Sequence, residues 1–146
     1  MAERTVFQST PNKHVLTVAP QASVWEAACA MTRANCGATL VMEPPDKLLG
    51  ILTERDLMTR VVARALEPKS TRVSEVMTPH PVCVAPETRV SDAVLIMLER
   101  GFRHLPIVAE GGRILGVFSA RDALPRELGT ALSQAEFNEQ VNDVLG

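Results

Sequence analysis

The stretch Leu49-Gly-Ile-Leu-Thr-Glu-Arg-Asp56 recurs 66 positions later in the chain as Leu115-Gly-Val-Phe-Ser-Ala-Arg-Asp122. The same shift, without a gap, aligns Val18-Ala-Pro-Gln-Ala-Ser-Val-Trp-Glu-Ala27 with Val84-Ala-Pro-Glu-Thr-Arg-Val-Ser-Asp-Ala93. Ten of the 39 positions from Val18 to Asp56 are identical in the two copies. Self-similarity at a fixed period indicates repeated structural units, and two such units can close face to face as a pseudo-twofold pair.

The apolar pattern within each copy predicts the order strand, helix, strand, strand, helix. In the first copy we expect strands at 15–18, 39–42 and 48–52, a helix from Val24 that stops at Asn35-Cys-Gly37, and a helix from Thr53. In the second copy we expect strands at 82–85, 105–108 and 114–118, and a helix at 91–100. Pro125 would shorten or kink the last helix, because proline removes a backbone hydrogen bond. The sequence therefore predicts an α/β (α+β) fold.

The predicted boundaries give five segments. They are an N-terminal segment (1–13), a first unit (14–65), a connector (66–78), a second unit (79–126) and a C-terminal helical tail (127–146). The N-terminal segment carries little signal. In the tail, Ser133-Gln-Ala-Glu136 resembles a capping box that would begin a helix. The apolar residues of that helix would share one face and pack on their own chain or at a dimer contact: Phe137, Val141, Val144 and Leu145.

Composition argues against several classes of protein. The 146 residues carry a formal net charge of −2 and only five aromatic side chains, four Phe and one Trp. A nucleic-acid-binding protein usually has a basic surface or a stacking platform, so we expect no nucleic-acid partner. The longest strongly apolar run, at 93–98, is far shorter than the roughly 20 residues that span a bilayer. Three cysteines without Cys-x-x-Cys spacing predict neither a disulfide framework nor a zinc site, and a cytoplasmic location fits best.

The repeat resembles tandem CBS domains, a pair known as a Bateman module. The duplicated stretches quoted above, the connector Val76-Met-Thr-Pro-His-Pro81 and the phrase Phe102-Arg-His-Leu-Pro-Ile-Val108 carry the resemblance, which extends from about Val15 to Leu124. It implies two β-α-β-β-α CBS units packed as a pseudo-twofold pair. It also implies two clefts that bind adenosine-containing ligands (AMP, ADP, ATP, NAD(H) or S-adenosylmethionine), and assembly as a homodimer.

The best candidate binding residues are the hydroxyl and carboxylate of the duplicated Thr/Ser-x-x-Asp element. Thr53 and Ser119 lie where a strand is expected to end and a helix to begin. The carboxylates of Asp56 and Asp122 can each accept two hydrogen bonds, which suits the vicinal hydroxyls of a ribose. The alternative interpretation is a simple capping box. Two copies in register favour ribose binding.

Arg103 and His104 form a second candidate element, because arginine and histidine can both donate hydrogen bonds to a phosphate. The matching residues of the first unit, Gly37 and Ala38, carry no charge. The family resemblance implies that the first strand of each unit lines the adenine. The candidate nucleotide-binding residues are therefore Thr17, Val18, Ala38, Thr53, Arg55, Asp56, Met77, Pro81, Cys83, Val84, Arg103, His104, Pro106, Ser119, Arg121 and Asp122.

These residues favour a regulatory module that senses adenine nucleotides, catalyses no reaction and acts through a separate effector protein. No residue combination at telling spacing indicates a catalytic or metal site. An interaction module is the alternative: its clefts would be vestigial, and it would bind a partner protein through the C-terminal helix. An enzyme acting on nucleotides is a third class, and it predicts that the nucleotide is consumed.

Overall fold

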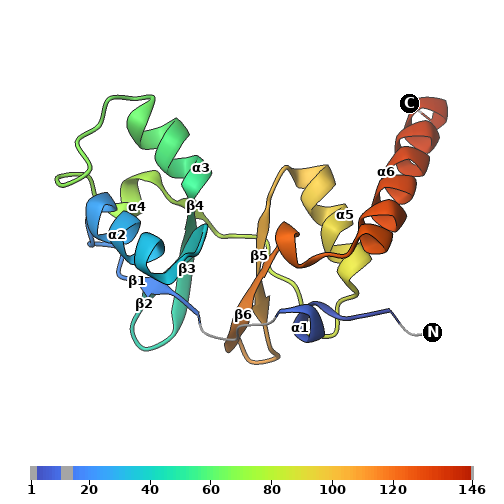
Figure 1. Ribbon diagram of the computed structural model, residues 1–146, viewed down its shortest axis with the longest axis horizontal. Helices are drawn as coiled ribbons and strands as arrows, with labels where there is room; N and C mark the ends of the chain where they lie inside the picture. Colours follow the sequence, from blue (N-terminus) through green and yellow to red (C-terminus); the bar gives the residue numbers. More distant parts are fainter. Residues whose placement is uncertain (1–2, 11–14, 146) are drawn as a thin grey trace. The chain divides into compact units, whose positions relative to one another are not determined.

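The computed structural model describes residues 3–10 and 15–145, and these residues form two β-sheets with flanking helices (Figure 1). Contacts divide the chain into two compact units. The first unit is His14–Pro81, and the second unit is Val82–Gly146 together with Met1–Lys13. The predicted α/β fold class and the C-terminal helix are confirmed.

The first unit contains a four-stranded sheet in the order β1-β2-β3-β4. Strand β1 runs parallel to β2, and the β2–β3 and β3–β4 pairs are antiparallel. Its elements are β1 (Thr17–Val18), α2 (Val24–Ala34), β2 (Ala38–Glu43), β3 (Lys47–Thr53), α3 (Glu54–Asp56), the π-helix η1 (Leu57–Val62), α4 (Val73–Val76) and β4 (Thr78–Pro79). The buried apolar core joins the helices to one face of the sheet through Val24, Ala27, Met31, Val41, Leu52, Val61, Val73 and Val76.

The second unit contains a two-stranded antiparallel sheet, β5–β6. The strand expected at 82–85 is reduced to an isolated parallel bridge between Val84 and Ile107. The elements are α1 (Val6–Ser9), α5 (Val90–Arg100), β5 (His104–Val108), β6 (Ile114–Ser119), the 3₁₀ helix η2 (Ala120–Asp122) and α6 (Pro125–Leu145). Its core consists of Val6, Val84, Val90, Ala93, Val94, Met97, Leu105, Ile107, Phe118 and Ala131.

The duplication extends to backbone detail. Helices α2 and α5 each have eleven residues and begin 66 positions apart. Each ends on a left-handed residue, Asn35 (φ 53°) and Gly101 (φ 75°), and asparagine and glycine are the residues that tolerate this conformation best. The strand register shifts at Val41/Met42 in the first unit and at the matching Ile107/Val108 in the second. The repeat read from the sequence is therefore a repeat of structure.

Two segments without an expected fold complete the units. In the connector, the Val73 N–H donates to the Ala22 carbonyl (2.8 Å), and the Val24 N–H donates back to Thr71 (2.9 Å). The N-terminal segment makes the same bonds in the second unit, from Val6 to Thr88 (2.8 Å) and from Val90 to Arg4 (3.0 Å). The connector precedes the second unit but packs on the first, and the N-terminal segment precedes the first unit but packs on the second. Neither contact was expected from the sequence.

The C-terminal region also differs from the expectation. Helix α6 begins at Pro125, eight residues before the expected start at Ser133, so the predicted boundary at 126/127 falls inside it. Pro125 occupies the first helical position, where its missing N–H removes no helical hydrogen bond. The helix packs along α5 and buries Ala131. Phe137 and Val144 of the expected apolar face are 59% and 85% exposed.

Candidate functional site

The candidate residues gather at two equivalent junctions between a strand and the following helix. In the first unit Thr53, at the end of β3, is paired in register with Ala38. In the second unit Ser119, at the end of β6, is paired with His104. The backbone link is repeated as well, because the Glu54 N–H donates to Gly37 and the Ala120 N–H donates to Arg103, both at 3.0 Å.

At the first junction Asp56 and Thr53 form a reciprocal capping box. Oδ2 of Asp56 accepts hydrogen bonds from the Thr53 N–H (3.0 Å) and hydroxyl (3.1 Å), and the Thr53 hydroxyl accepts from the Asp56 N–H (3.2 Å). The Arg60 Nε lies 3.6 Å from Oδ1 of Asp56, one helical turn later. Asp56 is only 8% exposed, so these contacts hold the carboxylate in one orientation.

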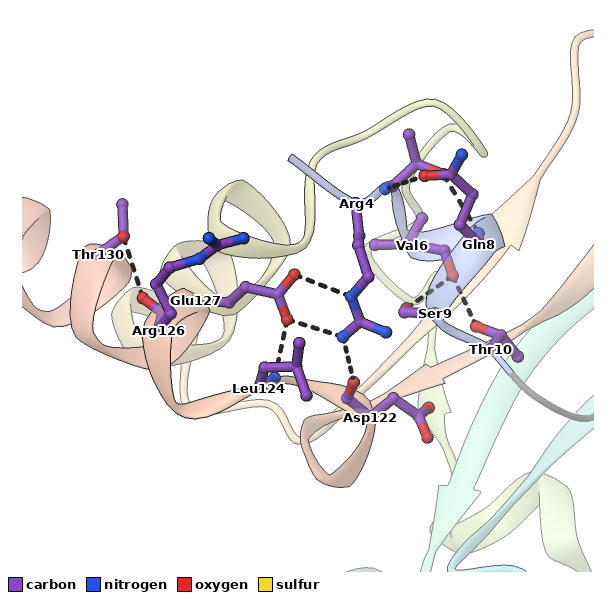
Figure 2. A network of polar contacts seen from close by, with 11 residues as sticks. Arg4, Val6, Gln8, Ser9, Thr10, Asp122, Leu124, Arg126, Glu127 and Thr130 are labelled. Atoms are coloured by element: carbon purple, nitrogen blue, oxygen red, sulfur yellow. Dashed lines mark hydrogen bonds and ion pairs between the residues drawn. The ribbon is translucent and has the colours of Figure 1, made fainter. Parts of the chain in front are cut away.

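At the second junction Asp122 and Ser119 form the corresponding cap. Oδ2 of Asp122 accepts from the Ser119 N–H (3.1 Å), and the Ser119 hydroxyl accepts from the Arg121 N–H (3.3 Å). The Asp122 side chain is half-buried. Its backbone carbonyl accepts a hydrogen bond from Nη2 of Arg4 (3.0 Å), and the carboxylate points away from that guanidinium (Figure 2).

The capping interpretation is therefore realised at both junctions. A cap does not exclude a ligand, because a carboxylate has two oxygens and each cap uses Oδ2. Each carboxylate oxygen can accept two hydrogen bonds, so both aspartates keep capacity for a ribose hydroxyl, although Oδ1 of Asp56 also faces Nε of Arg60 at 3.6 Å.

The basic residues near the junctions are distributed unequally. Arg103 is exposed and His104 is half-buried at the start of β5, whereas their counterparts Gly37 and Ala38 are buried. Arg55 and Arg121, next to the aspartates, are both exposed. The second junction therefore has more cationic side chains with which to meet a phosphate.

The two segments expected to contact an adenine, at Thr17 and at Val84, differ in exposure and in backbone hydrogen bonding. Thr17 lies in β1, an edge strand of its sheet, and is exposed. Val84 is 7% exposed, and its N–H and carbonyl are both bonded, to Pro106 and Val108 at 2.9 Å. Its N–H is therefore already bonded within the chain, and its carbonyl oxygen keeps one lone pair.

The remaining candidate residues around these strands differ in exposure. Partial burial raises the pKa of the exposed Cys83 thiol, so the thiol is protonated at neutral pH. Met77 and Pro81 are half-buried. Pro106 is buried in β5, and Val18 is half-buried in β1 beside Thr17.

Three charged residues next to the aspartates were not predicted. Arg60 follows Asp56 by four positions, a spacing that places two side chains on one helix face. This spacing is visible in the sequence and could have identified Arg60. Arg4 and Glu127 are 123 positions apart. Only the fold brings them together.

The described residues contain no group of three or more metal-ligating side chains and no helix long and apolar enough to cross a bilayer. None of Cys29, Cys36 and Cys83 forms a disulfide.

Comparison with known proteins identifies the family. A family model described as the CBS domain matches residues 6–63 and 73–128. The chain belongs to the CBS domain family. The two matches coincide with the two copies of the repeat, and each includes one of the Asp56 and Asp122 junctions.

Relatives of this CBS pair differ widely in length. An uncharacterized 17.7 kDa protein of Acidianus ambivalens is 37% identical over 132 residues, which cover 90% of this chain and 77% of the relative. The meiotically up-regulated gene 70 protein of Schizosaccharomyces pombe is 32% identical over 139 residues, 89% of this chain but 19% of the relative. The chain thus spans only a fifth of that protein.

Solved structures share the fold. A putative signal-transduction protein with CBS domains from Burkholderia ambifaria is 33% identical with a TM-score of 0.74, covering 80% of this chain and 86% of that one. The CBS domain protein PAE2072 from Pyrobaculum aerophilum, complexed with AMP, has a TM-score of 0.78 and covers 90% of this chain and 100% of its own. At 21% identity it establishes the likeness of fold alone.

Proposed function

We propose that this CBS pair is a regulatory module that binds an adenosine-containing ligand: AMP, ADP, ATP, NAD(H) or S-adenosylmethionine. One observation carries the proposal. Each unit has an aspartate at the same strand-to-helix junction, held by the same cap through Oδ2. Because a carboxylate can accept about four hydrogen bonds, each aspartate keeps capacity for a ribose hydroxyl, although Oδ1 of Asp56 also faces Nε of Arg60. The AMP bound to the Pyrobaculum aerophilum protein of the same fold supports an adenine nucleotide.

The phosphate contacts in this proposal are unequal in the two units. Arg103 and His104 would bind phosphate in the second unit, together with Arg121. The first unit has Arg55 but only Gly37 and Ala38 at the matching strand start. A ligand with several phosphates should therefore bind the second unit more tightly.

The adenine would lie against the first strand of each unit. The exposed Thr17 and Cys83 are the best candidates to contact it, with Met77 and Pro81 nearby in sequence. Val18, Val84 and Pro106 would contribute apolar surface more than backbone hydrogen bonds.

Regulation requires that the ligand favour one state of the protein over another, since an equilibrium shifts only by the difference in affinity. We propose that the chain acts without catalysis, as a cytoplasmic homodimer, and passes its state to a separate effector protein. The family resemblance supports the homodimer, and three cysteines without a disulfide fit a cytoplasmic location.

Thermal unfolding with AMP, ATP, NADH and S-adenosylmethionine tests the proposal. A ligand at 100 times its Kd should raise the free energy of unfolding by about 2.7 kcal/mol, and GMP at the same concentration serves as a control for the base. The absence of a shift with all four ligands would overturn the proposal. Chromatography of the incubated nucleotide should recover it intact, and its consumption would instead indicate an enzyme.

A second candidate function is protein binding through α6, with vestigial nucleotide sites. The observation in its favour is the exposure of large apolar side chains along this helix, namely Leu128, Leu132, Phe137 and Val144. The same thermal unfolding measurements separate the two candidates, because only a nucleotide sensor should be stabilised by any of the four ligands.

A further inference from the structure

An ion pair links the two ends of the chain beside Asp122 (Figure 2). Nη2 and Nε of Arg4 donate to the two carboxylate oxygens of Glu127 at 2.8 and 3.2 Å, a two-pronged geometry. The Glu127 side chain is 3% exposed, whereas that of Arg4 is 35% exposed. The arrangement is strong for a charge pair because both carboxylate oxygens are engaged and one partner is shielded from water.

The same two residues also hold the backbone on either side of the bend before α6. Nη2 of Arg4 donates to the Asp122 carbonyl (3.0 Å), and Oε1 of Glu127 accepts from the Leu124 N–H (2.8 Å). Asp122 and Leu124 flank Ala123, whose extended backbone (φ −82°, ψ 142°) separates η2 from α6. Arg4 therefore fixes the backbone that carries the Asp122 carboxylate.

In the first unit, the arginine beside the aspartate comes from the helix that follows it. There the chain continues from α3 into η1 without a break, so Arg60 comes to lie 3.6 Å from the Asp56 carboxylate. Its Nη1 also donates to the Val76 and Met77 carbonyls, at 3.3 and 3.1 Å. The repeat places Arg126 at the matching position, but it is exposed in α6 beyond the break at Ala123.

We propose that Arg4 is a positioning residue for the nucleotide site of the second unit, an inference that rests on the proposed function. It holds Asp122 in the orientation that a ribose hydroxyl needs, and Glu127 holds Arg4. Ligand binding in the second unit is therefore coupled to the attachment of the N-terminal segment and of α6. The first unit, with Arg60, has no such dependence on a terminus.

Coupling of this kind is reciprocal. A nucleotide that favours the ordered Asp122 must strengthen the Arg4–Glu127 attachment by the same factor by which that attachment strengthens nucleotide binding. The N-terminal segment and α6 thereby become the parts of the second unit that respond to the ligand, and a partner bound to either would in turn alter the affinity.

Titration calorimetry with AMP on single-site chains tests the inference. Asp56→Ala leaves only the second site, and Asp122→Ala leaves only the first. In the Asp56→Ala chain, Arg4→Met should weaken AMP binding about tenfold, within the usual range of coupling between sites. In the Asp122→Ala chain the same substitution should leave the affinity unchanged. A loss of general stability would weaken both sites. Circular dichroism of each variant checks that the second unit stays folded, so a selective loss of affinity in a folded chain indicates positioning.

Arg89→Met is the matched control. Arg89 pairs with Glu3 of the same N-terminal segment (3.4 Å) and with Asp92 (2.9 Å), but the Asp122 carbonyl is bonded by Arg4 instead. This control should leave AMP affinity unchanged at both sites, and Arg4→Lys, which keeps the charge without the fork, should recover part of the loss.

The possible outcomes separate the inference from the proposed function. If the unsubstituted chain binds AMP at the second site and Arg4→Met binds it equally well there, the inference is wrong and the proposed function stands. If Arg4→Met weakens both sites alike, Arg4 is structural and the inference is again wrong. If the unsubstituted chain binds no AMP at all, both fail together.

Discussion

At the scale of single residues, the two equivalent glycines Gly50 and Gly116 have different surroundings. A Cβ on Gly50 would lie 2.6 Å from the Met77 Sδ and 2.8 Å from the Thr78 carbonyl oxygen, because β4 pairs closely with β3. A Cβ on Gly116 would lie 3.7 Å from its nearest neighbour, a methyl group of Thr10. The sequence conserves the glycine in both copies, but only one copy needs it for packing.

Gly50→Ala should therefore destabilise the protein by about 1–3 kcal/mol, the usual cost of overpacking. Gly116→Ala should be neutral or should stabilise by up to about 1 kcal/mol, because alanine loses less backbone entropy than glycine in a strand. Urea denaturation of both variants measures the difference. Equal effects of the two substitutions would contradict the close approach of β4 at Gly50.

Glu127 makes stability depend on pH. The hydrogen bond from Arg4 lowers the pKa of the Glu127 carboxyl below its ordinary value. A lowered pKa in the folded state contributes stability above the unfolded pKa of about 4.3 and loses that contribution as the pH falls through the folded pKa.

We expect the free energy of unfolding of Glu127→Gln at pH 7 to be about 1.5–3 kcal/mol lower than that of the unsubstituted chain, the usual contribution of a hydrogen bond to a charged group. The difference should shrink below about pH 4, where protonation weakens the unsubstituted pair as well. Urea denaturation at pH 7, 5 and 3.5 tests this. A difference that stays constant over this range would mean that the charge of Glu127 contributes nothing.

At the scale of helices and strands, periodicity predicted the longer elements well. Helices α2 and α5 and strands β2, β3, β5 and β6 begin and end within two residues of the expectation. Each carries its own signal in sequence: apolar residues at helical spacing, a β-rich run, or a stop such as Asn35.

The short elements lacked such a signal. Helices α1 and α4 have four residues each, too few to display a period, and backbone bonds to the loops before α5 and α2 hold them in place. The sequence misplaces the start of α6 because Ser133 and Glu136 resemble a cap. Pro125, which the pattern predicts to break a helix, instead occupies the first helical position.

In the candidate site, too, the sequence predicted the local contacts and missed the long-range ones. Both caps followed from the local Thr/Ser-x-x-Asp pattern, since their hydrogen bonds span three residues. The Arg4–Glu127 pair depends on long-range packing and left no trace in local sequence. The Thr/Ser-x-x-Asp pattern is the same for a plain cap and for a cap that also binds a ligand, so it does not separate the two.

At the scale of the whole molecule, the two units share the repeated fold but differ in the residues around their aspartates. Both carry the capped aspartate, but the first secures it with Arg60 of its own helix and the second with Arg4 from the N-terminal segment. The second unit adds Arg103 and His104 where the first has Gly37 and Ala38. If both units bind a nucleotide as proposed, these differences predict unequal affinities and unequal dependence on the chain termini.

The central claim is that Asp56 and Asp122 bind the ribose of an adenosine ligand. Titration calorimetry of AMP with the unsubstituted chain, Asp56→Ala, Asp122→Ala and the double variant tests it most directly, with circular dichroism to verify folding. Each single substitution should abolish binding at its own unit, and the double variant should bind no AMP. A folded double variant that binds AMP with the affinity and stoichiometry of the unsubstituted chain would contradict the claim and leave both aspartates as helix caps alone.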